Sequence, residues 1–512
     1  MGARTKPMVT FESKGQAPTD GLRKGEMVDG EFRKSSGMNW FLAGFFLVGA
    51  IAGGGIVALP TAVQQCGLHA GVVVCLLMAA VATTSAILLG RSWMILVELW
   101  PEYRSHCRNP YAEIGYRALG LKAKSLVSLC VNLNQFGGAV VFFLLPAKNI
   151  HDFVAIFTPH GPDLCTWLLI LGVCMLPVVM LKSPEDFWWT VIAGMGATSL
   201  AVVLIVVGAA RDHAACSPSA AHPPFRATNL FAAFGTIVFT FCSHATYPQV
   251  LSFVLLMLTI QHDMRRPAQF TRSAILAYGI VLTCYASVVI TALTTYGDSL
   301  RDSVINSIQT PWIQQAVNMM IAAHCILNVA LTFNPLNQEV EEYFGIPQGF
   351  GWPRVAVRGA ILAAVVFTAE SVPSFGPVMS LMGASTFTLI CIVFPPTFYV
   401  FLAARKRSGT TGQAESCGIR DTIRLNDRPI IALTVFFILV GAVCGTTATW
   451  AATVEITSTR FEVPCYVRAF TAGSRAENFT STPINCCGPF QNISVHGQPD
   501  GYCNAPQLDF YG

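Results

Sequence analysis

Three adjacent glycines, Gly53-Gly54-Gly55, interrupt an apolar stretch that would otherwise suit a lipid bilayer, and Pro60 follows them. Glycine runs form poor helix, and a freed backbone N–H or C=O in hydrocarbon has no water partner. Such a break is tolerated where it lines a cavity or binds a ligand. The second half-helix would then present free N–H groups and a positive dipole end, which suit a carboxylate. Spacing alone leaves an alternative open, a glycine-rich packing seam against a neighbouring helix.

The sixth apolar segment contains a polar centre formed by Cys242, Ser243 and His244, with Gly235 and Pro248 on either side. A histidine in mid-membrane is costly unless it faces a cavity or a partner. The glycine triplet lies in the first segment, and interruptions at matching positions of two halves indicate a transporter site built on inverted repeats. The alternative for His244 is a hydrogen bond to a backbone carbonyl with a structural role only.

Polar side chains also recur in two other apolar segments. In the third, Asn134 is one of three amides within four residues, of which one or two face the bundle interior. In the eighth, His324, Asn328 and Thr332 follow one another at spacings of four and form a stripe along one helix face. A packing seam or a water path would also account for this stripe. No paired carboxylate falls at a predicted midplane, so His244 or His324 is the candidate proton carrier, and we favour protons over sodium.

The segments that carry these residues are predicted to span a membrane. Of 512 residues, 53% are hydrophobic and 12% are charged, whereas soluble domains carry about twice that charged fraction. This composition excludes a soluble enzyme and predicts an all-α polytopic membrane protein without a cofactor. Glu341 and Glu370 fall near segment ends, where we expect them to be solvated. About eleven membrane segments are predicted, near residues 39–63, 69–97, 124–147, 164–181, 190–210, 229–258, 271–296, 312–334, 355–372, 375–402 and 430–453.

The basic residues predict the orientation of the chain. With a cytosolic N-terminus, 25 of the 32 Lys and Arg fall on the cytosolic side and seven on the other, as the positive-inside rule requires. Residues 1–38 are then a disordered cytosolic tail, 39–453 a transmembrane transporter domain, and 454–512 an extracellular or lumenal tail. That tail carries two glycosylation sequons, at Asn478 and Asn492, which are modified only on the lumenal side.

Several cysteines fall on the same side as the sequons, where disulfides persist. Four lie in the tail, and four cysteines allow three pairings among which the sequence does not choose. Two others lie beside membrane segments on that face and are candidates to pair with each other. The disulfide candidates are Cys465, Cys486, Cys487, Cys503, Cys165 and Cys216.

The interrupted segments carry a family resemblance. GGGIVALPTAVQQCG, which begins at Gly53, resembles the first-helix signature of the amino acid/auxin permease family. FGTIVFTFCSHATYPQ, which begins at Phe234, resembles its sixth-helix signature. Cytosolic loops of the family are similar to NPYAEIGYRALG (109–120), LKSPEDFWW (181–189) and LTFNPLNQEVEEYF (331–344).

The resemblance implies a fold of two inverted five-helix repeats, the APC-type transporter fold, with helices 1 and 6 broken. It also implies secondary transport of amino acids driven by protons or sodium. In such a site the helix-1 backbone meets the substrate carboxylate and the sixth segment lines the other half. The candidate substrate-binding residues are Gly53, Gly54, Gly55, Cys242, Ser243, His244 and Asn134. Helices 1 and 8 can share an ion site in this fold, and the candidates there are Thr332 and His324.

The sequence departs from the family pattern after Pro248, where Leu251 to Thr259 look like an insertion of about nine residues. With the insertion included, a continuous sixth helix of about 31 residues would be ~46 Å long, against a hydrocarbon core of ~30 Å. We expect the insertion to extend helix 6 as a tilted end within the membrane or its interface, because exposing its apolar side chains to water is unfavourable.

Together these features predict an ion-coupled, secondary active amino acid transporter that works as a monomer by alternating access. Its partners are the amino acid and membrane lipid, and not nucleic acid. The membrane is the plasma membrane or an endolysosomal or vesicular one. One rival is an amino-acid-sensing receptor on a transporter scaffold, with the 1–38 tail as its partner-binding element. The other is an ion channel, which the absence of a repeated filter motif in the sequence disfavours.

Overall fold

The chain was described from a computed structural model. The described residues are 26–28, 31–33, 37–104, 107, 109–158, 161–180, 188–220, 222, 225–242, 261, 264–301, 303–347, 349, 351–372, 375–409, 418–458 and 465–467. Within them lie eight helices long and apolar enough to cross a membrane, and three shorter apolar helices. Together these coincide with the eleven predicted segments, so the all-helical, multi-span fold class is confirmed.

The first half of the bundle begins with a helix in two pieces and continues with long helices. Its elements are α1 (Trp40–Ile51), the 3₁₀ turn η1 (Gly54–Val57), α2 (Leu59–Gln65), α3 (Leu68–Leu99), η2 (Pro101–Arg104), α4 (Pro110–Leu119), α5 (Leu121–Phe157), α6 (Leu164–Met180), α7 (Trp188–Cys216) and η4 (Ser217–Ser219). Of these, α4 is a short amphipathic helix between the second and third membrane segments.

The second half repeats this order, and one more helix follows it. Its elements are α8 (Ala227–Phe241), η5 (Pro267–Gln269), α10 (Phe270–Tyr296), η6 (Gly297–Ser299), η7 (Val304–Ser307), α11 (Pro311–Tyr343), α12 (Trp352–Ser371), α13 (Phe375–Met382), α14 (Phe394–Ser408), α15 (Ile419–Leu425) and α16 (Arg428–Ser458). Two π-helical turns, Gly383–Phe387 and Leu389–Val393, join α13 to α14.

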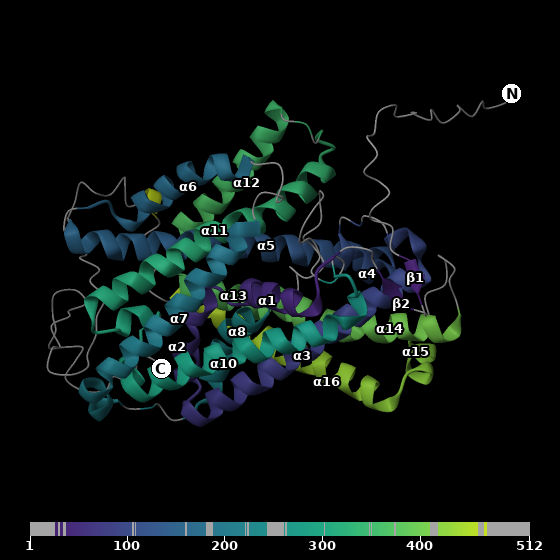
Figure 1. Cartoon of the computed structure of the whole chain (residues 1–512), viewed down its shortest axis with the longest axis horizontal. Helices are drawn as coiled ribbons and strands as arrows, with labels where there is room; N and C mark the ends of the chain where they lie inside the picture. The colour runs from purple at the N-terminus through teal and green to yellow at the C-terminus, as the bar shows by residue number, and fades with distance from the viewer. Residues whose placement is uncertain are drawn as a thin grey trace.

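The packing of the helices relates the two halves. The second segment, α3, packs on the tenth, α14, just as the seventh, α10, packs on the fifth, α7. Two further pairs, α5 with α11 and α6 with α12, join equivalent segments of the two halves. Figure 1 shows α1 and α8 in the middle of the bundle, with α5 and α11 on one side and α3 and α16 on the other. This is the pairing that two five-helix repeats predict.

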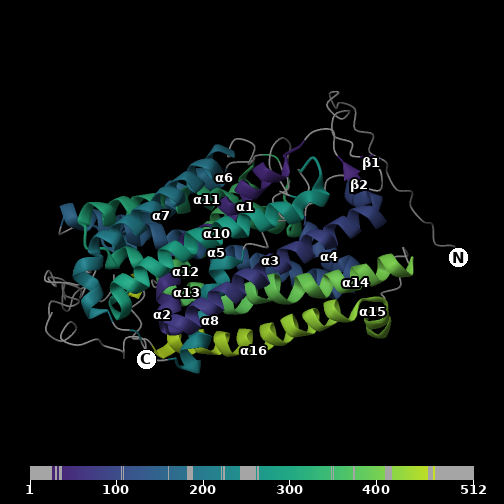
Figure 2. The same ribbon diagram turned by 60° about the horizontal axis from the view of Figure 1, so that its bottom comes forward.

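The two ends of the bundle differ in character. One end carries α4, α15 and the last turn of α14, with Arg405, Lys406 and Arg407, and is called the basic end below. Figure 2 shows α4, α15 and the N-terminal strands together at that end. The other end, called the disulfide end, carries the bond between Cys165 and Cys465, whose Cα atoms are 5.5 Å apart.

Part of the tail that was predicted to be disordered forms an antiparallel hairpin. Strand β1 (Glu26–Val28) pairs with β2 (Glu31–Arg33), with Met27 opposite Phe32. Between the strands the sequence reads Asp29-Gly30, the pair that two-residue hairpin turns favour. The prediction overlooked this turn signal because the composition of the tail is polar throughout.

The helix before the sixth-segment polar centre, α8, is continuous through Gly235 and ends at Phe241, directly before Cys242. Gly235 is a packing residue of this helix. A Cβ atom there would lie 2.1 Å from the Ser380 carbonyl oxygen, and one at Gly383 would lie 1.8 Å from the Gly235 carbonyl oxygen. Only glycine allows two backbones to approach this closely.

Glu341 and Glu370 are buried, so the expectation that both are solvated is wrong. Glu341 is 5% exposed and pairs with two arginines of α12. Its Oε1 lies 2.6 Å from Nε of Arg358 and 3.1 Å from Nε of Arg354. The sequence hid this pairing because the three residues lie on two helices whose packing it does not reveal.

Candidate functional site

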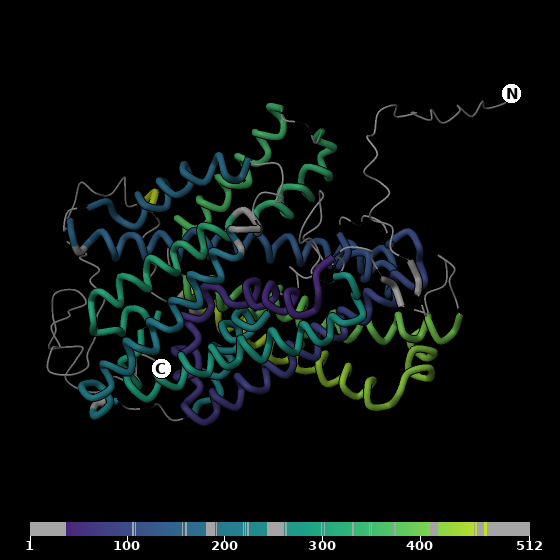
Figure 3. Tube along the Cα trace, in the orientation of Figure 1, coloured from purple at the N-terminus to yellow at the C-terminus, as the bar shows by residue number. Residues whose placement is uncertain are grey.

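The first membrane helix breaks at the glycine triplet. α1 ends at Ile51, and Ala52 and Gly53 have extended backbones with φ of −75° and −132°. The chain resumes as η1 and then α2, and Figure 3 follows the purple trace through this bend. Pro60 lies in the first turn of α2, where its missing N–H has no intrahelical acceptor to lose. The predicted break in helix 1 is therefore confirmed.

The same glycines are also a close crossing of helices. A Cβ atom at Gly54 would lie 2.6 Å from Cδ2 of Leu145 on α5. One at Gly55 would lie 2.8 Å from Oγ1 and 3.1 Å from Cα of Thr240 on α8. The triplet is therefore both a helix break and a glycine packing seam, because the helix unwinds there and α5 and α8 pack closely against it.

The end of α8 lies against this break. Buried Cys242 follows α8 with an extended backbone, φ −107° and ψ 109°. One residue before the helix end, the Oγ1 of Thr240 lies 3.4 Å from the Gly55 carbonyl oxygen. Ser243 and His244, predicted to line the site, lie outside the described residues, as does the insertion at 251–259.

His324 connects the break to two long helices. It is 2% exposed on α11, and a Cβ atom at Gly53 would lie 3.3 Å from its Nε2. On the other side of the ring, Nδ1 lies 2.7 Å from Oγ1 of Thr198 and 3.1 Å from the carbonyl oxygen of Gly194, both on α7. Nδ2 of Asn328 donates to the His324 carbonyl oxygen at 2.8 Å. We call His324, Thr198, Gly194 and Asn328 the histidine cluster.

The contacts of the histidine assign its tautomer. A carbonyl oxygen only accepts, so the 3.1 Å distance to Gly194 favours the proton on Nδ1, with the Thr198 hydroxyl, itself 3.1 Å from that carbonyl, as a donor to it. Nε2 is then the basic nitrogen, and it faces the break at Gly53. Protonation of His324 would therefore place new positive charge beside the unwound backbone, and would not disturb the bond to α7.

Thr332 and Asn134 are placed differently from His324. The hydroxyl of Thr332 donates back to the Asn328 carbonyl oxygen at 3.3 Å, and its methyl group faces Gly138 of α5. Asn134 is 5% exposed, and its Oδ1 has no hydrogen-bond partner among the described residues. Among the described residues, neither Thr332 nor Asn134 makes a hydrogen bond to the break at Gly53–Gly55. An unpaired buried amide oxygen is a candidate contact for a ligand.

Prediction from the sequence missed the α7 half of the site. Gly194 begins the run Gly-Met-Gly-Ala, and Thr198 follows that run directly. Small residues of this kind signal close helix approach in membranes. That signal was present but did not identify His324 as the partner. Tyr285 of α10, whose hydroxyl lies 3.1 Å from the Ile51 carbonyl oxygen, was also missed. From the sequence alone, a tyrosine in an apolar helix cannot be distinguished from an ordinary buried core residue.

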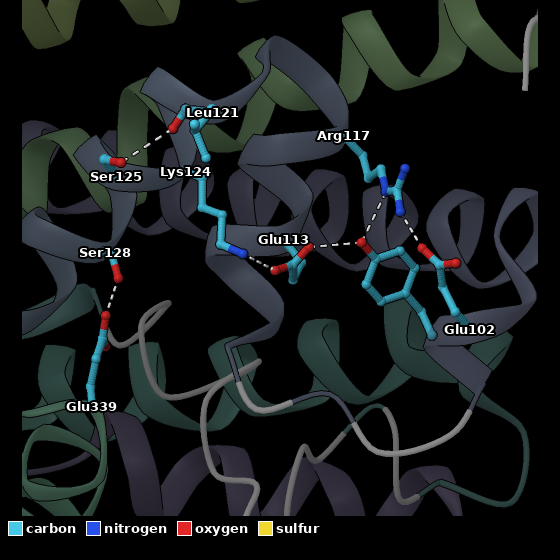
Figure 4. Close-up of polar contacts among 9 residues, drawn as sticks. Glu102, Glu113, Arg117, Leu121, Lys124, Ser125, Ser128 and Glu339 are labelled. Carbon is cyan, nitrogen blue, oxygen red and sulfur yellow. Dashed lines mark hydrogen bonds and ion pairs between the residues drawn. The ribbon is translucent and has the colours of Figure 1, made fainter. Parts of the chain in front are cut away.

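A network of charges holds the basic end together, as Figure 4 shows. The hydroxyl of Tyr103 donates to Glu113 at 2.7 Å and accepts from Nε of Arg117 at 2.9 Å. Lys124 reaches the other oxygen of Glu113 at 2.5 Å. Burial, followed by the bond to Glu113, raises the pKa of Tyr103, so the phenol remains a neutral donor. Nearby, burial raises the pKa of the Cys107 thiol to about 12.

A second contact in the same view links two helices of the site. Ser128 of α5 hydrogen-bonds Glu339 of α11 (Figure 4). These are the helices that carry Asn134 and His324, and they pack along much of their length. The basic end thereby fixes the spacing of α5 and α11 beneath the site.

The disulfide end is held covalently. Cys165 at the start of α6 bonds Cys465 of the tail and not Cys216, so the expected Cys165–Cys216 pair is wrong. Cys216 is also disulfide-bonded. The ring of Tyr466 stacks on Phe367 of α12, with centroids 5.4 Å apart. The remaining candidates, Cys486, Cys487 and Cys503, and the sequons at Asn478 and Asn492 lie outside the described residues.

Comparison with protein families gives one match over most of the chain. The family described as "Transmembrane amino acid transporter protein" matches residues 36–416. Among curated proteins of Arabidopsis thaliana, "Amino acid transporter AVT1B" is 23% identical over 421 residues, which cover 80% of this chain and 69% of that protein. "Lysine histidine transporter-like 4" is 23% identical over 400 residues, 73% of this chain and 83% of that protein.

Two solved transporter structures are also similar. "Inward facing conformation of Mhp1" matches with 13% identity and a TM-score of 0.48, over 90% of this chain and 96% of that one. "Crystal structure of MhsT in complex with L-phenylalanine" matches with 12% identity and a TM-score of 0.46, over 82% of this chain and 99% of that one.

Proposed function

The chain belongs to the transmembrane amino acid transporter family and is an integral membrane protein of many spans, and on that premise we propose that it moves amino acids by proton-coupled secondary transport. The observation that carries the proposal is the break in helix 1 with a buried histidine against it. Alternating access would close and open the bundle around this fixed centre.

The break suits the carboxylate of an amino acid. Gly54 and Gly55 open η1, so their N–H groups have no acceptor within that helix. A helix N-terminus also carries partial positive charge. Without a Cβ at either glycine, no side chain of the triplet itself covers these two amides. We place the substrate carboxylate here, with Gly53, Cys242 and Asn134 as further candidate contacts.

Proton coupling is assigned to His324. Its Nδ1–H is held by the Gly194 carbonyl, and its Nε2 faces the break. A charged imidazole inside the membrane is unfavourable unless the site supplies compensation. The carboxylate of the bound substrate supplies negative charge at the break, so proton and amino acid would bind cooperatively. His244 and Thr332 remain predictions for the same coupling site, and His244 lies outside the described residues.

The different characters of the two ends of the bundle support a proposal for its orientation. We propose that the basic end is cytosolic, in line with the positive-inside rule, and that the disulfide end is extracellular or lumenal, where a bond such as Cys165–Cys465 persists. The membrane is the plasma membrane or an endolysosomal or vesicular one, and the transporter works as a monomer.

Glycosylation tests this orientation. In a glycosylating host, endoglycosidase should increase the gel mobility of the wild type. The shift should disappear in the double variant Asn478→Gln, Asn492→Gln, because only the non-cytosolic tail is modified. A wild-type chain without a shift would count against the orientation.

Transport itself is tested in proteoliposomes with imposed ion gradients. Uptake of radiolabelled L-alanine, L-glutamine and L-lysine is measured under an inward proton gradient, an inward sodium gradient, or neither. We expect accumulation of at least one of them under the proton gradient alone. A panel of all proteinogenic amino acids without uptake under either gradient would contradict the transporter. An absolute sodium requirement would contradict the assignment of His324.

A further inference from the structure

Both breaks leave backbone carbonyls without a partner in their own helix. The last carbonyls of a helix have no intrahelical N–H to accept from, and in a membrane water does not replace it. α1 ends at Ile51 and α8 at Phe241. The carbonyls of Ile51, Thr240 and Phe241 therefore all lie at helix ends that face the centre of the bundle.

Two tyrosines of α10 reach these three carbonyls. The hydroxyl of Tyr285 lies 3.1 Å from the Ile51 oxygen and 3.3 Å from the Thr240 oxygen. The hydroxyl of Tyr278 lies 3.2 Å from the Phe241 oxygen. Seven residues are two helical turns, so both rings project from one face of α10.

Tyr285 is the only one of the two that touches both breaks. It is 1% exposed, and its ring meets Phe241 edge-on with centroids 5.3 Å apart. A hydroxyl has a single proton to give, and two carbonyls stand within reach of this one.

We infer that Tyr285 is a positioning residue that couples the two helix breaks and determines which of their carbonyls is free for the substrate. When its proton points to Ile51, the Thr240 oxygen has no other hydrogen-bond partner among the described residues, and the converse holds for the Ile51 oxygen. The free oxygen lies at the negative end of a helix dipole and is a suitable acceptor for the α-ammonium group of an amino acid. This last step rests on the proposed function, whereas the coupling of the breaks does not.

The same helix provides a matched set of variants. Tyr285→Phe removes the hydroxyl that joins the two breaks. Tyr278→Phe removes one that touches α8 alone. Tyr296→Phe is the control, because its hydroxyl is equally buried but donates to Asp212 of α7 at 2.7 Å, away from both breaks.

Hydrogen exchange of the purified full chain tests the coupling without any substrate. Without the Tyr285 hydroxyl, the segment around Gly53 should unfold locally more often. We expect amides of residues 49–58 to exchange at least about tenfold faster in Tyr285→Phe than in Tyr296→Phe, with matched melting temperatures as evidence of folding. Equal exchange in the two variants would overturn the coupling, whether or not the chain transports amino acids.

Uptake kinetics test the consequence for substrate. Using whichever of L-alanine, L-glutamine or L-lysine the wild type transports best, we expect Tyr285→Phe to raise KM at least about tenfold. Tyr278→Phe should raise KM by a smaller factor, and the KM of Tyr296→Phe should stay within about twofold of the wild-type value. A KM for Tyr285→Phe equal to that of Tyr296→Phe, in a wild type that transports, would overturn the ammonium assignment.

Discussion

Two buried polar clusters each include residues of α11 and differ in the state of their charges. The histidine cluster at the break is built from neutral groups, among which the imidazole of His324 and the hydroxyl of Thr198 can each donate or accept. The arginine cluster, defined as Glu341, Arg354 and Arg358, is built from full charges. Arg358 is 0% exposed and also donates to the Val179 carbonyl of α6 at 2.8 Å.

The difference between the clusters indicates which part of the bundle can change its conformation. Opposite charges buried together hold one arrangement, because removing either partner leaves an uncompensated charge. A neutral histidine can take up a proton on Nε2, which here lies 3.5 Å from Nδ2 of Asn328, so its environment has two states. The arginine cluster therefore ties α6, α11 and α12 into a rigid unit, while the histidine cluster lies where α11 meets the unwound helix 1.

The largest effect is expected at the break itself. Gly54→Val should reduce uptake at least about a hundredfold, equivalent to about 2.7 kcal/mol, because a Cβ there would lie 2.6 Å from Leu145 Cδ2. Uptake per surface-expressed molecule is the measurement. Gly279→Val is the control, since a Cβ at that exposed position meets nothing within 4 Å. Normal transport by Gly54→Val would contradict both the close packing of the triplet against α5 and its place in the site.

The next effect is on stability. Glu341→Gln should lower the free energy of unfolding by about 3–5 kcal/mol, because two arginines lose their buried carboxylate. Glu98→Gln is the control, since the exposed pair of Glu98 with Lys406 is worth at most about 1 kcal/mol. Thermal unfolding in detergent measures both. If Glu341→Gln were as stable as the control and instead altered coupling, the contrast between a fixed and a changeable cluster would be lost.

A smaller effect is expected from deletion of residues 251–259. This segment leads from the site to Gln261, whose Nε2 donates to the Gly90 carbonyl of α3 at 2.9 Å. The family pattern closes up across the gap, so we predict that the shorter chain transports about threefold faster, a change of less than 1 kcal/mol in the barrier. The measurement is uptake per surface molecule for both forms. A folded but inactive deletion form would show that the segment is integral to the transporter.

More of the fold than of the site could be predicted from the sequence. Segment positions and the break at Gly53 could be predicted because hydropathy and glycine runs are local signals. The partners of these elements could not. Tyr285 and Ile51 are 234 residues apart, and Cys165 and Cys465 are 300 apart. Neither residue of such a pair carries a mark that identifies the other.

The burial of Glu341 shows the same limit. A carboxylate near a helix end reads as solvated, and only the packing of α12 against α11 brings Arg354 and Arg358 to it. His324 was found as a candidate because histidine is rare in apolar helices. Its role required Thr198 and Gly194 of another helix to assign the proton to Nδ1.

The central claim, that His324 carries the coupling proton, is tested most directly by proton flux. Proteoliposomes with a trapped pH dye receive a pulse of the transported amino acid, and acidification is recorded beside amino acid counterflow. In His324→Gln we predict counterflow within about threefold of wild type but no amino-acid-dependent acidification. His213→Gln is the control, because that histidine lies in the last turn of α7 and contacts Thr295 of α10. Wild-type acidification by His324→Gln would contradict the account.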